Sequence, residues 1–302
     1  MTQNTRLGIA LMIAAVFMFS IQDALSKHLA QTYNTMMIVM VRYWVFAVFV
    51  AMLAMRRPGG LRRGAATKHP FLHLTRSALL IAEICVIVTA YTIIGLINTH
   101  AVFAVCPLIV TALSGPILGE RVGLARWLAI GAGMAGVMVI LQPGSGMFQL
   151  AALLPLASAL MFALYSLLTR LATRKEDAFL SLFWSGIFGA ALITPIGLFF
   201  WQPIHGIDWL WTALYGAIAV LANWLLIKCY EVAEASAVQP FAYFQILFVS
   251  LVGVFVFGET LRSNVVVGGA IVVGAGLVSL ALARGGGAGG RTAVPTEARP
   301  ET

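Results

Sequence analysis

Three ionisable side chains lie inside long apolar stretches of the sequence, where a charge needs a physical reason. Arg42 lies in MVRYWVFA, Glu83 in LLIAEICVIV and His100 in INTHAVF. At the centre of a membrane such a charge costs roughly 3 kcal/mol on insertion scales, so we expect it to be paired or functional. Arg42 and Glu83 could tie two helices together or recognise a charged substrate, and Glu83 could carry a proton. His100 could be a solvated interfacial residue or a gating or proton-linked group.

Aromatic and amide side chains in the same kind of stretch predict a wet central cavity. Buried Tyr and Trp need hydrogen-bond partners, and aromatic faces can stack on a substrate or attract an ammonium group. Amide side chains could orient a carboxylate or an amide. For any one of these residues, packing or lipid contact is the alternative. The candidates are Gln22, Tyr91, Tyr165, Trp184, Asn223, Trp224, Tyr243, Phe244 and Gln245.

Two prolines lie in the interiors of apolar stretches. Pro107 and Pro240 each remove a backbone hydrogen bond, which frees the carbonyls of Phe103 and Ser236. Such breaks are tolerated in a membrane where neighbouring groups or cavity water satisfy the backbone. The prolines therefore predict either a cavity between their two helices or packing kinks without ligand contact.

The sequence lacks the patterns that catalysis, metal binding and ATP hydrolysis require. It contains no H-E-x-x-H, G-x-S-x-G or G-x4-G-K-[ST] motif, and its five His residues are scattered. The three Cys lie in apolar segments without the spacing of metal ligands, so we expect buried thiols. We predict neither an enzyme nor a metal or other cofactor.

Composition places the chain in a lipid bilayer. Of its 302 residues, 61% are hydrophobic and only 10% are charged, whereas a soluble domain carries about 25% charged residues. No strand-period alternation appears, which leaves a bundle of helices. The excess of basic residues lies mostly in loops, so it indicates membrane orientation and not nucleic-acid binding.

Apolar runs of membrane-spanning length predict ten transmembrane helices. We expect them at residues 7–27, 35–55, 77–97, 99–118, 124–141, 149–170, 178–200, 208–230, 236–257 and 264–283. The Gly-rich polar tail at 284–302 is expected to be disordered.

The distribution of Lys and Arg predicts the orientation. Of 19 such residues, fifteen fall on the side that holds both termini, two fall on the other side, and two lie within spans. Positive residues accumulate on the cytoplasmic side. We therefore expect a multi-pass protein of a bacterial-type inner (plasma) membrane with both termini in the cytoplasm.

The two halves of the chain echo each other. FSIQDALSKHLA (19–30) resembles FALYSLLTRLAT (162–173), and LGERVG (118–123) resembles FGETLR (257–262). An odd number of spans in each half makes equivalent spans cross in opposite directions. We predict two inverted five-helix repeats, at 7–141 and 149–283, an arrangement typical of secondary transporters. In the first copy, Asp23 and Lys27 are four residues apart and could pair on one helix.

Together these features resemble the EamA-type exporters of the drug/metabolite transporter superfamily. The resemblance rests on the five-span halves, the two Leu/Phe-Gly-Glu turns, Arg42 in MVRYWVFA and the AxAVQPFAYFQ stretch at 235–245. Within the superfamily the chain looks most like the YddG-type amino-acid exporters. The resemblance implies alternating access around a central cavity and export of amino acids, with aromatic and other apolar ones favoured.

Two further questions stay open at the level of the sequence. An exporter of lipophilic cationic drugs or of another small metabolite would suit the aromatic residues and Glu83 equally well. Small-residue spacings in the Gly-rich fifth and tenth spans allow close helix approach, such as Ala132-x3-Gly136 and Ala270-x3-Gly274. They could pack one chain as a scaffold, so that a monomer suffices, or form a dimer contact.

Overall fold

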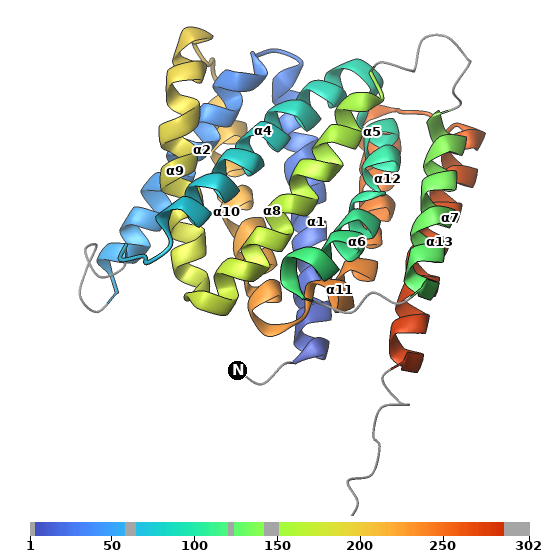
Figure 1. The fold of residues 1–302 in the computed structure, drawn as a ribbon. Coiled ribbons are helices and arrows are strands. Elements are labelled where there is room, and N and C mark those ends of the chain that lie inside the picture. Colours follow the sequence, from blue (N-terminus) through green and yellow to red (C-terminus); the bar gives the residue numbers. More distant parts are fainter. Residues whose placement is uncertain (1–3, 58–64, 120–123, 142–150, 287–302) are drawn as a thin grey trace, which may run out of the picture.

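The computed structural model describes residues 4–57, 65–119, 124–141 and 151–286, and all regular elements within these ranges are helices (Figure 1). They are α1 (Thr5–Ala30), α2 (Thr35–Met55), α4 (Pro70–Ile94), α5 (Leu96–Phe103), α6 (Cys106–Leu118), α7 (Leu124–Leu141), α8 (Leu153–Lys175), α9 (Ala178–Phe199), α10 (Asp208–Val232), α11 (Ala235–Val238), the 3-10 helix η1 (Gln239–Tyr243), α12 (Phe244–Phe257) and α13 (Ser263–Gly286).

Local sequence signals explain where several helices begin and end. The side chains of Asn4, Asn34 and Asp177 accept hydrogen bonds from amides in the first turns of α1, α2 and α9. The two Gly-Glu turns place Gly119 and Gly258 in the left-handed region, with φ of 72° and 63°, which ends α6 and α12. The two glycines therefore end equivalent helices of the two halves in the same way.

Within the described residues, seven helices have the length and hydropathy to cross a membrane, counting α5 and α6 as one, and three shorter apolar helices accompany them. This confirms an all-helical membrane protein. Some expected boundaries were wrong. The third span starts earlier than expected, at Pro70, and it also ends earlier, at Ile94. It ends there because Gly95 has a φ of 84°, which stops the helix. Helix α13 continues to Gly286, so three residues of the expected tail are helical, and 287–302 lie outside the described residues.

The fourth and ninth spans are interrupted, although the sequence predicted one helix for each. The fourth consists of α5 and α6, and the ninth of α11, η1 and α12. Pro107 and Pro240 do not lie in the interior of a helix. Each occupies the first turn of the segment that follows an interruption, where the missing N–H has no intrahelical partner to lose.

The most extensive helix contacts join the first half of the chain to the second. Helix α1 packs on α10, α4 on α8, α2 on α9, and α7 on α13. Helix α1, the first span of its half, meets α10, the third span of the other half. Helix α4, the third span of its half, meets α8, the first span of the other. A two-fold relation between the halves produces this exchange. The beginning of α1 and the end of α13 lie at the same end of the bundle, and α8 runs opposite to α1 (Figure 1). We call this the terminal end, and the opposite end the far end.

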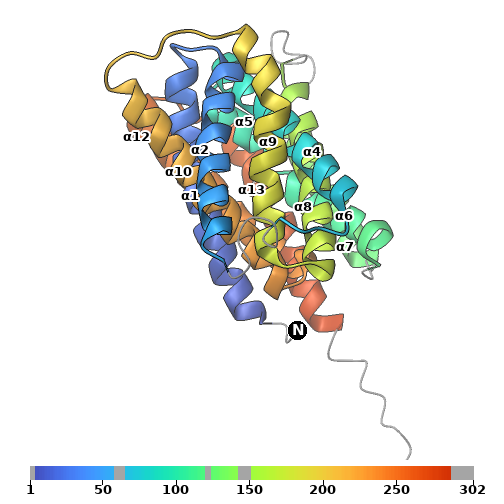
Figure 2. The ribbon, with the colours of Figure 1, turned by 90° about the vertical axis from the view of Figure 1, so that its left-hand side faces the viewer.

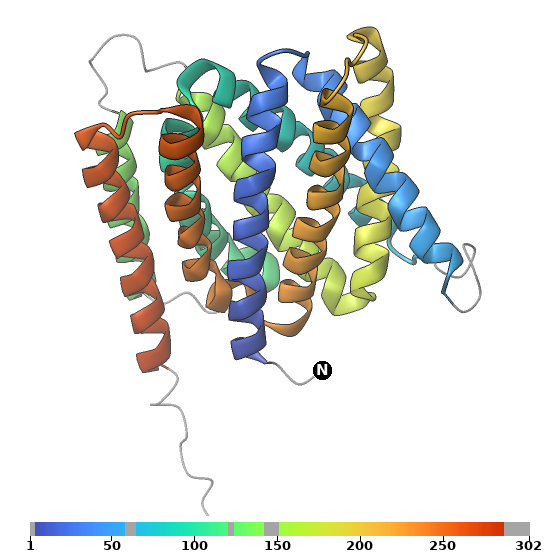
Figure 3. The same ribbon diagram turned by 180° about the vertical axis from the view of Figure 1, so that it is seen from behind.

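Helices α7 and α13 form a pair at one edge of the bundle (Figures 1 and 3). A side view shows the remaining long helices crossing the molecule beside one another (Figure 2). A Cβ on Gly268 would lie 2.6 Å from the carbonyl oxygen of Gly136, so these two glycines let the helix backbones touch. Gly274, which the sequence placed in a close-packing motif, has no atom within 4 Å of its Cβ position. The expectation that Gly274 packs α13 against another helix of the same chain is therefore wrong, and a dimer contact at this position stays a prediction.

Candidate functional site

Two adjoining cavities lie between the halves, with volumes of about 40 and 30 Å³. Each has room for a few water molecules only. We call the first the polar cavity. Its polar lining comes from α1, α2, α4, α5, α10 and α12 and consists of Gln22, Asp23, Ser26, Arg42, Glu83, Tyr91, His100, Tyr215, Asn223 and Gln245.

The second, the aromatic cavity, is lined mainly by rings and aliphatic groups. Phe19, Phe103 and Phe162 border both cavities, and Tyr230 and Tyr243 border the second alone. The ring of Phe162 meets Phe19 edge-on at a centroid distance of 6.2 Å and lies tilted against Phe103 at 5.7 Å. These separations are those of favourable aromatic pairs. The rings therefore form one continuous aromatic wall between α1, α5 and α8.

A hydrogen-bonded group at the boundary of the two cavities joins four helices. His100 Nε2 lies 2.9 Å from the hydroxyl of Tyr91 and 3.1 Å from Asp23 Oδ2. Gln245 on α12 donates to the same Asp23 oxygen at 3.2 Å. All three ionisable groups are buried. Sequence analysis named His100, Tyr91 and Gln245 separately, and folding brings them together around Asp23.

Arg42 and Glu83 line the polar cavity without pairing with each other. Glu83 accepts a 2.7 Å hydrogen bond from Ser158 on α8. The guanidinium of Arg42 donates to the hydroxyl of Tyr215 at 3.4 Å and lies 5.3 Å from the ring centre of Tyr43. The alternative in which these two charges tie their helices together directly is therefore not what the structure shows.

The other predicted residues divide between the site and the periphery. Gln22 and Asn223 line the polar cavity, and Tyr165 donates to Asn223 at 3.2 Å. Pro107 and Tyr243 line the aromatic cavity. Pro240 has only its backbone described, in η1.

Three predicted aromatic residues lie away from both cavities, which corrects the expectation. Trp184 donates to the carbonyl of Ala65 and stacks on Phe188. Trp224 lines a groove on the outside of α2, α9 and α10, and Phe244 lines one on the outside of α5, α12 and α13. Being inside a span does not place a ring inside the bundle.

Four residues that the sequence analysis did not single out contribute to the site. Tyr215, Ser158, Phe162 and Phe103 line the cavities or bind groups that do. Phe162 had a signal, because it is the residue that aligns with Phe19 in the repeated stretch. The others had none, since a Tyr, Ser or Phe in an apolar helix is ordinary.

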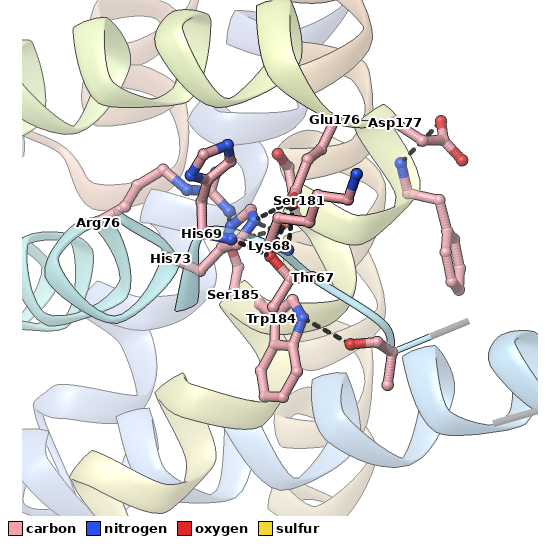
Figure 4. Close-up of polar contacts among 12 residues, drawn as sticks. Thr67, Lys68, His69, His73, Arg76, Glu176, Asp177, Ser181, Trp184 and Ser185 are labelled. Carbon is pink, nitrogen blue, oxygen red and sulfur yellow. Dashed lines mark hydrogen bonds and ion pairs between the residues drawn. The ribbon is translucent and has the colours of Figure 1, made fainter. Parts of the chain in front are cut away.

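A second polar cluster lies at the terminal end, where α4 meets α8 and α9 (Figure 4). Arg76 is fully buried and donates to the hydroxyls of Thr169 and Ser185 and to the carbonyl of Ser181. Next to it, His73 contacts the Glu176 carboxylate at 2.8 Å. Thus one helix of the first half is held to two of the second.

Glu176 lies in the short link between α8 and α9 and collects several donors. Thr67 and the Lys68 amide donate to the carboxylate that also meets His73. Burial alone raises the pKa of the Glu176 carboxyl, but these hydrogen bonds outweigh it and lower the pKa below the ordinary value of 4.5.

Comparison with known proteins decides the family. The model of the EamA-like transporter family matches twice, over residues 6–142 and 149–281. The chain belongs to the EamA-like transporter family. It is therefore a membrane transporter and not an enzyme, as the sequence predicted.

The relatives of this EamA-like transporter carry two kinds of substrate in their names. A riboflavin transporter of Vibrio cholerae serotype O1 is 30% identical over 275 residues, which are 88% of this chain and 90% of that protein. A riboflavin transporter of Rhizobium johnstonii is 33% identical over 70% of each chain. An S-adenosylmethionine uptake transporter of Rickettsia prowazekii is 24% identical over 89% of this chain and 91% of its own.

A solved structure has the same fold, with a TM-score of 0.66 at 18% identity, covering 93% of this transporter and 97% of that chain. The match of the family model confirms the expected EamA-like family. The narrower expectation of an amino-acid exporter has no support from the relatives named above.

Proposed function

We propose that this EamA-like protein is a secondary transporter that works by alternating access between two inverted five-helix repeats, at 7–141 and 149–283. The exchange of helix partners between the halves and the opposite directions of α1 and α8 support the inversion. The excess of Lys and Arg on the side of the termini supports a cytoplasmic location for both termini in a bacterial inner membrane. One chain contains both halves, so a monomer suffices.

The substrate proposed is riboflavin or a closely similar flat heteroaromatic molecule. The observation that carries this is the contact between an aromatic wall and a polar cavity, in a chain related over most of its length to riboflavin transporters. Riboflavin has a planar ring system, which suits the faces of Phe103 and Phe162, and a chain of hydroxyl groups, which suits the polar cavity.

Unused hydrogen-bonding capacity in the lining fits such a substrate. Among the described residues, the side-chain oxygen of Gln22, the Nε of Arg42 and the hydroxyl of Tyr243 are buried and have no hydrogen-bond partner. Buried polar groups without partners are costly. Hydroxyl and carbonyl groups of a bound substrate would satisfy them.

S-adenosylmethionine is the second candidate, because it carries a sulfonium and an ammonium charge. Two carboxylates, Asp23 and Glu83, face the polar cavity and would attract a cation. The same two groups would suit a lipophilic cationic drug. Relatives named for S-adenosylmethionine uptake favour the metabolite over the drug.

The cavities are too small for any of these molecules in the conformation described. Substrate entry therefore requires the halves to separate at one end, and polar contacts between the halves close both ends. Lys27 pairs with Glu259 at the far end, and His73 pairs with Glu176 at the terminal end. Alternating access would break one contact while the other holds.

The test is counterflow in liposomes that contain the purified protein. Radiolabelled riboflavin, S-adenosylmethionine and tryptophan are each added outside liposomes that hold the same compound unlabelled. Saturable riboflavin exchange, above that of empty liposomes, supports the proposal. Exchange of S-adenosylmethionine alone moves the assignment to the second candidate, and exchange of tryptophan alone restores the amino-acid expectation. Loading from one side at a time measures the direction, which the resemblance implied to be export.

A matched pair of variants links the transport to the cavity. Gln22→Ala removes a buried lining side chain, whereas Gln202→Ala removes an exposed one in the loop after α9. We expect the first to raise KM for riboflavin and the second to leave it unchanged. Equal effects of both variants would show that the polar cavity is not the binding site.

A further inference from the structure

A single ring nitrogen of His100 faces two oxygen atoms on two other helices. Nε2 is 2.9 Å from the hydroxyl of Tyr91 on α4 and 3.1 Å from Asp23 Oδ2 on α1. One nitrogen can either donate its proton or accept one through its lone pair, but cannot do both. The geometry therefore fits two protonation states: a neutral imidazole with its proton on Nδ1, whose Nε2 accepts from Tyr91, and an imidazolium, whose Nε2 donates to Asp23.

In the state without the extra proton, Nε2 has a lone pair and accepts the O–H of Tyr91. The Asp23 carboxylate then faces the lone pair and keeps the hydrogen bond from Gln245. When a proton arrives at Nε2, the N–H donates to Asp23. The Tyr91 hydroxyl can then no longer donate to the nitrogen, and it turns its O–H toward Asp23. The proton remains on Nε2, and no other bond is made or broken. The group changes from a net charge of −1 to an imidazolium–carboxylate pair with no net charge.

We propose that Asp23, His100 and Tyr91 form a proton-binding site whose occupancy controls the contact of α5 with α1, and so couples transport to a proton gradient. The proposal rests on the transporter function proposed above. With the proton bound, an ion pair joins α1 to α5 and, through Gln245, to α12 of the second half. Without the proton, the attraction between His100 and Asp23 is lost, and α5 can move away from α1 at the boundary between the cavities.

The position of the site supports coupling. His100 and Gln245 border both cavities, and Asp23 borders the polar one, so a substrate passing between the cavities meets the site. The other charged or titratable groups lining the polar cavity are Arg42 on α2, Glu83 on α4 and Tyr215 on α10. Arg42 and Glu83 have their own partners, Tyr215 and Ser158. Helix α8 contributes only Phe162 to this lining, and α12 only Gln245.

Proton binding can be measured without any substrate. The thermal unfolding midpoint of the detergent-purified protein is recorded across pH, because a group that binds protons differently in the two states makes stability depend on pH. The wild type is compared with His100→Gln, Asp23→Asn and Tyr91→Phe. His28→Gln, an exposed histidine on the same helix as Asp23, is the control.

We expect the control to keep the pH profile of the wild type. His100→Gln and Asp23→Asn should each lose the same pH-dependent component, and Tyr91→Phe should displace it along the pH axis. If His100→Gln keeps the full wild-type profile, or differs only by a constant offset, the proposed proton site is wrong.

The transport measurement separates the two proposals. Riboflavin accumulation driven by a pH gradient should be lost in Asp23→Asn and His100→Gln and should persist in the control His28→Gln, whose side chain is exposed and lines neither cavity. Gradient-driven accumulation that persists in both variants would overturn the coupling role. Absence of riboflavin counterflow in the wild type would overturn the substrate proposal instead, and the unfolding profiles would still decide whether the proton site exists.

Discussion

Glu259 pairs with Lys27, and the same carboxylate accepts hydrogen bonds from the backbone amides of Leu96 and Ile97. The contact joins the last turn of α1, the first turn of α5 and the Gly-Glu turn after α12. A carboxylate at the start of a helix is stabilised by the free amides and the helix dipole. Gly95 makes room for it, because a Cβ there would lie 3.1 Å from Glu259 Oε1. The far end is therefore closed by one acidic residue that links both halves.

Removing Glu259 should destabilise the protein more than removing Lys27. Glu259→Ala leaves a buried ammonium and two amides without their acceptor, so we expect a loss of about 3–5 kcal/mol. Lys27→Met leaves the carboxylate on its two amides, and the expected loss is about 1–3 kcal/mol. Lys228→Met is the control, since Lys228 is partly exposed and pairs with Glu231 on the same helix, α10. Thermal unfolding in detergent ranks the three, and a larger loss for Lys27→Met than for Glu259→Ala would contradict the capping role.

Contact between two glycines holds α7 against α13, and one methyl group should disturb it. Gly268→Ala places a Cβ 2.6 Å from the carbonyl oxygen of Gly136, which cannot move away without shifting a helix. We expect a loss of about 1–3 kcal/mol from this overpacking. Gly274→Ala adds the same methyl group in open space on the same helix, and should be neutral or stabilise by about 0.5–1 kcal/mol. Equal unfolding midpoints for the two variants would show that the helix pair does not depend on this close approach.

Acid should weaken the terminal end through Glu176. Its pKa is lowered in the native protein, so the folded state favours the ionised carboxylate more than the unfolded state does. The resulting stability is fully present above the ordinary value of 4.5 and is lost as the pH falls through the lower native value. Glu176→Gln should therefore cost most at neutral pH and progressively less in acid. Unfolding midpoints of both proteins across this range test it, and a difference that stays constant with pH would refute the assignment.

The architecture could be read from the sequence because lipid imposes simple requirements. Apolar length predicts spans, and the two Gly-Glu turns predict the repeat, since only particular residues can end a helix in the left-handed conformation. Partners across the fold could not be read in the same way. Lys27 has Asp23 four residues away as an obvious partner, yet it pairs with Glu259, 232 residues distant. Asp23 in turn pairs with His100.

The sequence also could not show which face of each helix points into the bundle and which points to lipid. In a soluble protein the apolar stripe identifies the buried face, but a helix in lipid is apolar all round. Trp184, Trp224 and Phe244 therefore look like cavity residues in the sequence, although they lie outside the cavities. Polar residues gave better guidance, because Gln22, Asn223 and Gln245 all line the polar cavity. A hydrogen-bonding group avoids lipid, whereas an aromatic ring does not.

This distinction predicts opposite outcomes for two aromatic residues on neighbouring elements. Phe162→Ala removes the ring that joins Phe19 to Phe103 in the aromatic wall, so it should raise KM for riboflavin by about tenfold. Trp184→Ala removes a ring that stacks on Phe188, away from both cavities, so it should lower the unfolding midpoint and leave KM unchanged. Riboflavin uptake measured over a range of concentrations gives KM, with each variant reconstituted at matched amounts of folded protein. A raised KM in Trp184→Ala together with a normal KM in Phe162→Ala would place the substrate path beside Trp184 and not at the aromatic wall.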